Sequence, residues 1–75
     1  MMGLPVVTPR QLIRALLRAG FFVHHVRGSH HYLKHPDKPG LLVSVPFHSR
    51  DLKRGTVGAI LRQAGIAVDE LRDPL

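Results

Sequence analysis

The most informative part of the chain is residues 21–47, which read FFVHHVRGSHHYLKHPDKPGLLVSVPF. This stretch is rich in aromatic, β-branched and histidine residues, and glycine or proline stands at each break, a pattern typical of short strands joined by turns. The predicted strands are Phe21–Arg27, His30–His35 and Leu41–Val45. The turns between them are predicted at 28–29 (GS) and 36–40 (PDKPG). Because both connections are short, we expect the three strands to form an antiparallel meander.

Amphipathic helices are predicted on both sides of this meander. Thr8 followed by Pro9 is typical of a helix start, and Gly20 of a helix end. The predicted core face of this first helix consists of Leu12, Ile13, Leu16 and Leu17, and an arginine stripe on another face consists of Arg10, Arg14 and Arg18. Thr56 is predicted to cap a second helix that ends at Gly65. Its expected core residues are Val57, Ile60, Leu61 and Ala64, and a last helical turn is expected at Val68–Leu71.

The predicted order of elements is therefore helix, three strands, helix. It indicates an α+β domain of two layers (α-β-β-β-α), with a three-stranded antiparallel sheet and both helices on one face of that sheet. The chain has 75 residues and contains no repeat, low-complexity stretch or internal linker. We therefore expect a single domain over residues 1–75, with its core at about residues 8–71.

The composition restricts the function. The chain has no cysteine, which excludes a disulfide framework, thiol catalysis and thiolate metal ligation. The apolar runs are too short to cross a bilayer, so we expect a soluble, cytoplasmic protein. Eleven Lys and Arg against five Asp and Glu give a formal net charge of +6. This excess makes a polyanion such as RNA the expected partner, although an acidic protein or a membrane surface also fits the charge.

Six histidines lie within residues 24–48 and carry the densest chemistry of the chain. One interpretation is that they are ordinary half-exposed strand residues. A zinc site is a second interpretation, but no HExxH or comparable spacing occurs, and we predict no metal. The third is general acid/base catalysis on RNA, in which an imidazole takes the proton of a ribose 2′-OH while lysine or arginine stabilises the charged phosphate. This reaction needs neither a cofactor nor a deep pocket.

Alternation along the second strand separates its side chains into two sets. One set is His31, Leu33 and His35, and the other is His30, Tyr32 and Lys34. Tyr32 is predicted to be a core residue, as are Phe21 and Phe47, because the chain has only four aromatic residues. This assignment would place His31 and His35 on the open face of the sheet, away from the helices.

The sequence resembles the HicA toxin family, also called YcfA-like, the small mRNA interferases of HicA–HicB toxin–antitoxin pairs. The resemblance covers roughly residues 8–71 and rests on the order and spacing of several short elements. These are Gly20-Phe21, Gly28-Ser29-His30-His31, His35-Pro36, Val45-Pro46-Phe47-His48 and the segment 52–66 (LKRGTVGAILRQAGI). The resemblance implies a fold similar to double-stranded-RNA-binding domains, ribosome-independent cleavage of mRNA, and neutralisation by a HicB-type antitoxin.

The resemblance also implies which histidine is catalytic. Some family members have Asn at the third position of the Gly-Ser-His-His element and keep His at the fourth, so the role carries over to His31, with His30 as second choice. The residues predicted to contact the RNA backbone are Ser29, Lys34, Lys53 and Arg54. Two alternatives stay open, a non-catalytic RNA-binding module with the same basic surface and a metal-dependent nuclease.

Overall fold

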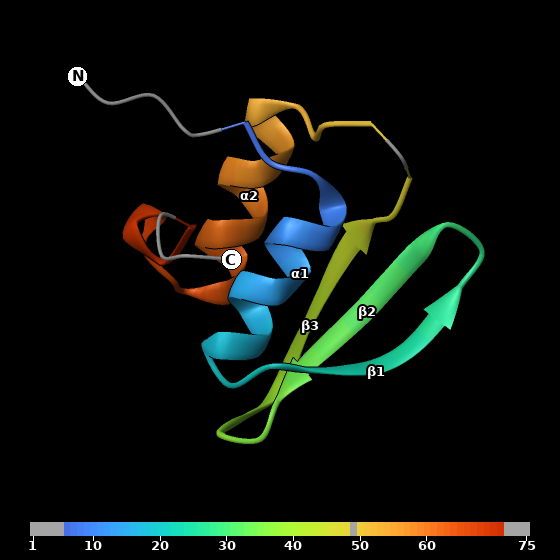
Figure 1. The fold of residues 1–75 in the computed structure, drawn as a ribbon. Coiled ribbons are helices and arrows are strands. Elements are labelled where there is room, and N and C mark those ends of the chain that lie inside the picture. The colour runs from blue at the N-terminus through green and yellow to red at the C-terminus, as the bar shows by residue number, and fades with distance from the viewer. Residues whose placement is uncertain (1–5, 49, 72–75) are drawn as a thin grey trace.

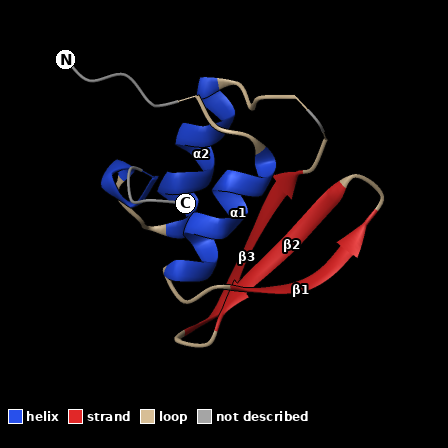
Figure 2. Ribbon diagram, viewed as in Figure 1, coloured by secondary structure: helices blue, strands red, loops and turns tan. Residues whose placement is uncertain are grey.

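The computed structural model describes residues 6–48 and 50–71. The elements are α1 (Pro9–Arg18), β1 (Phe22–Arg27), β2 (His30–His35), β3 (Lys38–Pro46), α2 (Arg54–Ala64) and the 3₁₀ helix η1 (Val68–Leu71). The three strands form one antiparallel sheet in the order β1-β2-β3, and the helices lie on one side of it (Figures 1 and 2). The predicted α+β domain with α-β-β-β-α order is therefore confirmed.

Helix α1 begins as the sequence predicts. The Thr8 hydroxyl accepts a hydrogen bond from the Gln11 backbone N–H at 3.2 Å, and the Gln11 side-chain oxygen accepts one from the Thr8 N–H at 2.9 Å. This reciprocal pair satisfies two backbone donors that the helix itself leaves free, while Pro9 has no N–H to satisfy. The predicted core face is correct except for Leu17, which is 46% exposed. The buried stripe runs instead through Leu12, Ala15 and Leu16, and Leu17 lies beyond its edge.

Helix α2 begins earlier than predicted. It starts at Arg54 after Lys53, and no side chain caps its first turn, so the prediction that Thr56 caps this helix is wrong. Its four predicted core residues are all buried, and the helix ends before Gly65 as expected. Two side chains attach its C-terminal end to β3: the Lys38 ammonium donates to the Ala64 carbonyl at 3.1 Å, and the Gln63 amide donates to the Leu42 carbonyl at 3.0 Å.

The core lies between the helices and the strands β2 and β3. Leu33, Val43 and Val45 are fully buried on the sheet side. Strand β3 extends beyond the predicted 41–45 because it is an edge strand, where Pro39 can sit without removing a hydrogen bond between strands. Strand β1 is the opposite edge, and every one of its residues is exposed. No helix in the described parts of the chain is long and apolar enough to cross a membrane.

The two faces of β2 are the reverse of the predicted ones. Leu33 is fully buried and pairs with the buried Val43, whereas Tyr32 is only half-buried. His31 and His35 share the face of Leu33, so they lie on the helix side of the sheet and not on the open face. The prediction that Tyr32 is a core residue is wrong. Leucine is wholly apolar and gains most from full burial, whereas tyrosine has a hydroxyl group that can stay hydrated when the ring is only half-buried.

Candidate functional site

The start of β2, the end of β3 and the start of α1 meet at one end of the domain. His31 pairs with Val45 across β2 and β3, and the pairing continues beyond both strands through a hydrogen bond from the Phe47 N–H to the Ser29 carbonyl. This bond holds the segment after β3 against the tip of the β1–β2 hairpin. The sheet thereby places the predicted catalytic element beside the residues that follow β3.

His31 is held by an aromatic neighbour. Its ring stacks on Phe47, with 4.3 Å between the ring centroids and 23° between the planes. The side chain is half-buried, and only its Nδ1 atom is buried without a hydrogen-bond partner. Stacking and burial together fix the orientation of the imidazole. The nitrogen that can meet a substrate is therefore Nε2.

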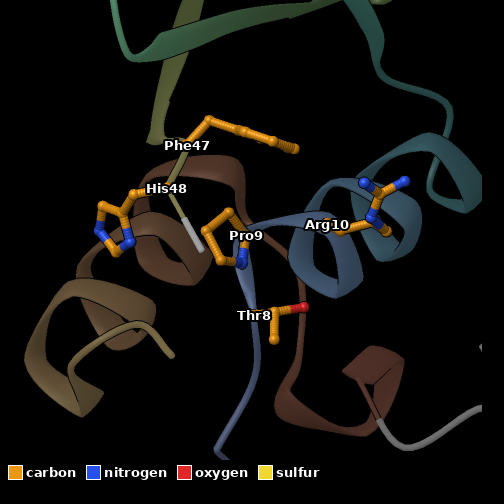
Figure 3. Close-up of a pocket in the computed structure, with 5 residues that line it drawn as sticks. All are labelled: Thr8, Pro9, Arg10, Phe47 and His48. Carbon is orange, nitrogen blue, oxygen red and sulfur yellow. The ribbon is translucent and has the colours of Figure 1, made fainter. Parts of the chain in front are cut away.

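A pocket of about 350 Å³ lies next to this stacked pair. Its lining residues are Thr8, Pro9, Arg10, Phe47 and His48 (Figure 3). The Phe47 side chain extends over Pro9 toward Arg10, and His48 lies on the other side of the pocket. His31 is not part of the lining itself and contacts the pocket wall through Phe47. Arg10 and His48, which are both exposed, therefore line the same pocket as Phe47, the residue that stacks on His31.

A second pocket of about 420 Å³ lies between the end of β3 and the start of α2. Its lining residues are Pro46, His48, Arg50, Asp51, Leu52, Lys53 and Thr56. His48 lines both pockets, so the two hollows adjoin at this side chain. The lining residues of the two pockets include three basic side chains, Arg10, Arg50 and Lys53, and one acidic side chain, Asp51. This excess of positive charge favours a negatively charged ligand such as a phosphate.

The other predicted site residues are spread over the surface. Ser29 is exposed at the tip of the β1–β2 hairpin, and Arg54 is exposed at the first position of α2. His30 and Lys34 lie on the open face of β2, opposite to His31. The structure therefore places Ser29, His31 and Lys53 around one end of the domain and separates Lys34 from them.

His35 shares a face with His31 but has a different environment. Its Nε2 lies 3.1 Å from the Ala19 carbonyl, and its Nδ1 accepts the Asp37 N–H at 3.1 Å. The ring also packs edge-on against the buried Phe21, at 4.9 Å between centroids. Both ring nitrogens are used within the fold, so His35 joins the end of α1 to the β2–β3 turn and has no proton free for a substrate.

Sequence reasoning did not single out Phe47 and His48 as site residues, and it named Arg10 only as part of the arginine stripe. The signal that could have found them is the Val45-Pro46-Phe47-His48 element, which stands at the end of a strand and combines an aromatic ring with an exposed imidazole. Within the described residues, no three His, Asp or Glu side chains come together as a group that could hold a metal ion.

Comparison with known families gives one informative match. The sequence model described as HicA toxin of bacterial toxin–antitoxin systems matches residues 9–66 of the 75 residues. The matched range includes the whole sheet, the stacked pair of His31 and Phe47, every lining residue of the second pocket, and all lining residues of the first pocket except Thr8. A search of curated proteins gave no match.

Proposed function

The chain belongs to the HicA toxin family of bacterial toxin–antitoxin systems, and we propose that it is an endoribonuclease that cleaves mRNA without a metal ion, with His31 as the general acid/base. Family membership supports the role of a toxin with an antitoxin partner. The observation that carries the proposed chemistry is the position of His31, whose ring is held by Phe47 beside a pocket that contains Arg10 and His48.

The proposed reaction uses the ribose of the substrate as its nucleophile. His31 Nε2 takes the proton of a 2′-OH, the 2′ oxygen attacks the adjacent phosphorus, and the bond from phosphorus to the 5′ oxygen breaks. The products are a 2′,3′-cyclic phosphate and a 5′-hydroxyl group, and the leaving oxygen receives a proton. His48 is exposed and lines both pockets, so it is placed to supply that proton.

Basic side chains around the pockets would bind the phosphate and stabilise the negative charge that grows during the reaction. Arg10 lines the first pocket and Lys53 the second. We propose that Arg54 and the Ser29 hydroxyl contact neighbouring phosphates, because both residues are exposed, Arg54 follows the pocket residue Lys53, and the Ser29 carbonyl is bonded to the pocket residue Phe47. Such contacts position the RNA without reading its sequence.

We propose that a HicB-type antitoxin neutralises this activity. Arg10, Arg14 and Arg18 are exposed along α1, and Arg10 also lines the first pocket. An acidic surface of the partner that binds this helix would cover Arg10 and the entrance of the pocket at the same time. Complementary charge of this kind also speeds association.

The test is cleavage of a short single-stranded RNA by the purified chain in the presence of EDTA. We expect cleavage to persist in EDTA, because the proposed reaction uses only side chains and the 2′-OH. A matched oligonucleotide with 2′-deoxyribose throughout should stay intact, and the RNA products should carry 2′,3′-cyclic phosphate ends detectable by mass spectrometry.

Each other outcome contradicts a defined part of the proposal. Loss of cleavage in EDTA would indicate a metal-dependent nuclease. Cleavage of the deoxy oligonucleotide would exclude the 2′-OH as nucleophile. RNA that is bound but remains intact after long incubation would indicate an RNA-binding module without catalysis.

A further inference from the structure

The face of the sheet turned away from the helices carries a row of aromatic rings. The rings of His25 and Tyr32 stack across β1 and β2 with 4.5 Å between centroids and 12° between planes. His24 continues the row, with its ring edge-on to His25 at 5.0 Å and its Nδ1 atom 2.7 Å from the Nδ1 atom of His25. His30 follows Tyr32 at 6.2 Å. We refer to His24, His25 and Tyr32 as the open-face row.

The row depends on an irregularity in β1. The register shifts between Val23 and His25, so that His24 is an extra residue without its own partner in β2. A bulge of this kind re-aims side chains and is common next to binding sites. It allows two consecutive residues, His24 and His25, to bring their rings into contact, where regular alternation would place them on opposite faces.

The charge around the row is positive. None of the residues of β1, β2 and β3 is Asp or Glu. Arg27 and Lys34 share the open face with Tyr32, one toward each end of the row. The imidazole rings of His24 and His25 are exposed. Packing of the core does not account for the exposed His24 and His25 rings beside the half-buried Tyr32, since the core lies on the other face.

We propose that the open-face row is a binding surface for single-stranded RNA, on which bases stack while Arg27 and Lys34 contact phosphates. Aromatic and imidazole rings on a sheet are suitable partners for the flat faces of unpaired bases, and a groove or face of positive charge follows the backbone. An acidic protein surface would use the two cations but would gain little from stacked rings. The rings and cations of this face therefore favour a ligand that has both negative charges and flat aromatic groups, as single-stranded RNA does.

This inference rests on the proposed function, because it takes RNA to be the substrate and specifies that it is single-stranded. The row and His31 lie on opposite faces of the sheet. The two faces meet at the start of β2, where His30 and His31 are consecutive. RNA that stacks on the row would pass around the hairpin end to reach the pocket. Duplex RNA hides its base faces and would not bind the row.

Intrinsic fluorescence tests the inference directly, because Tyr32 is the only tyrosine and the chain has no tryptophan. The probe is a single-stranded 2′-O-methyl oligouridylate of about ten nucleotides, which lacks the 2′-OH and stays intact. We expect saturable quenching of Tyr32 emission, corrected with free tyrosine amide. An abasic oligonucleotide of equal charge, or a 2′-O-methyl duplex, should leave the emission unchanged.

Variants of the row give the matching affinity test by fluorescence anisotropy of a labelled probe. His25→Ala should weaken binding about fivefold or more, the effect of losing one stacked base, and His25→Phe should restore it. Arg27→Ala should weaken binding more than Arg62→Ala, which removes an exposed arginine of α2 outside the row. His25 is exposed, so these variants should keep the circular dichroism of the unmodified chain.

Failure of this inference is distinguishable from failure of the proposed function. Unchanged Tyr32 emission together with equal affinities of His25→Ala and the unmodified chain would overturn the binding surface, even if the chain cleaves RNA. Quenching by the single strand from a chain that cleaves no RNA would support the surface and contradict the catalytic proposal.

Discussion

The two faces of β2 differ in what surrounds them and in what their side chains are free to do. On the helix side, Leu33 is fully buried, His35 uses both ring nitrogens, and His31 is stacked on Phe47. On the open side, Tyr32 is half-buried and stacks on the exposed His25. One six-residue strand thus supports the core and positions an imidazole with one face, while it presents rings to solvent with the other.

This difference shows that position along a face matters as much as the face itself. His31 and His35 lie on the same side of β2, and His31 stacks on Phe47, which lines the first pocket. His35 lies at the end of α1, where Ala19 and Asp37 occupy both of its ring nitrogens. A histidine suited to chemistry in this small domain is one that the fold holds without using all of its hydrogen-bonding capacity.

The largest expected effect on stability comes from truncating one large side chain on each face of β2. Leu33→Ala should lower the free energy of unfolding by about 2–5 kcal/mol, because it opens a cavity in a fully buried site. Tyr32→Ala should cost only about 1 kcal/mol, as is usual for a partly exposed residue. Urea denaturation of both variants measures the difference. A Tyr32→Ala loss as large as that of Leu33→Ala would contradict the assignment of the faces.

A smaller effect is expected at two glycines that both have positive φ. Gly20 has φ 100°, and a Cβ atom there would lie 2.6 Å from His35 Nε2. Gly28 has φ 57°, and a Cβ atom there would meet nothing within 4 Å. Both alanine variants have the backbone cost of about 1–2 kcal/mol, but Gly20→Ala must also displace His35 from the Ala19 carbonyl.

Thermal unfolding of the two glycine variants tests this interpretation. The melting temperature of Gly20→Ala should be lower than that of Gly28→Ala by several degrees. In a small domain, each kcal/mol of lost unfolding free energy lowers the melting temperature by about 4–8 °C. Equal melting temperatures would show that the contact between Gly20 and His35 does not constrain the helix side.

The smallest expected effect separates two histidines on opposite faces. His35→Ala removes two hydrogen bonds to backbone groups and the contact with Phe21, and should cost about 1–2 kcal/mol. His24→Ala removes a ring contact and a hydrogen bond to His25, both exposed to solvent, and should change the unfolding free energy by less than about 0.5 kcal/mol. Chemical denaturation with several replicates can resolve this difference.

Much of the fold could be predicted from the sequence, because glycine and proline mark the strand ends and the capping residues mark α1. The bounds of β2 were predicted correctly, and its alternation separated the two sets of side chains correctly. The orientation of those sets was predicted wrongly, because each set contains one large side chain that could face the core, Leu33 in one and Tyr32 in the other. Tertiary packing determines which of the two side chains faces the core, and the sequence of a single strand does not contain that information.

The candidate site could be predicted only in part for a similar reason. The Gly-Ser-His-His element indicated His31. Phe47, which stacks on His31, follows β3, and Arg10, which lines the first pocket with Phe47, lies in the first turn of α1, so both are 16 or more positions away from His31 in the sequence. The bulge at His24 has no glycine to mark it, and regular alternation along β1 would put His24 and His25 on opposite faces. Contacts between distant segments and one-residue insertions require the three-dimensional structure.

The most direct test of the central claim compares cleavage of one single-stranded RNA by His31→Ala and His30→Ala under single-turnover conditions. If the helix side of β2 performs the chemistry, His31→Ala should lose at least about 100-fold in rate, the contribution typical of a general acid/base, and His30→Ala should lose less than tenfold. A large loss in His30→Ala with near-normal cleavage by His31→Ala would move the chemistry to the open face and contradict the account.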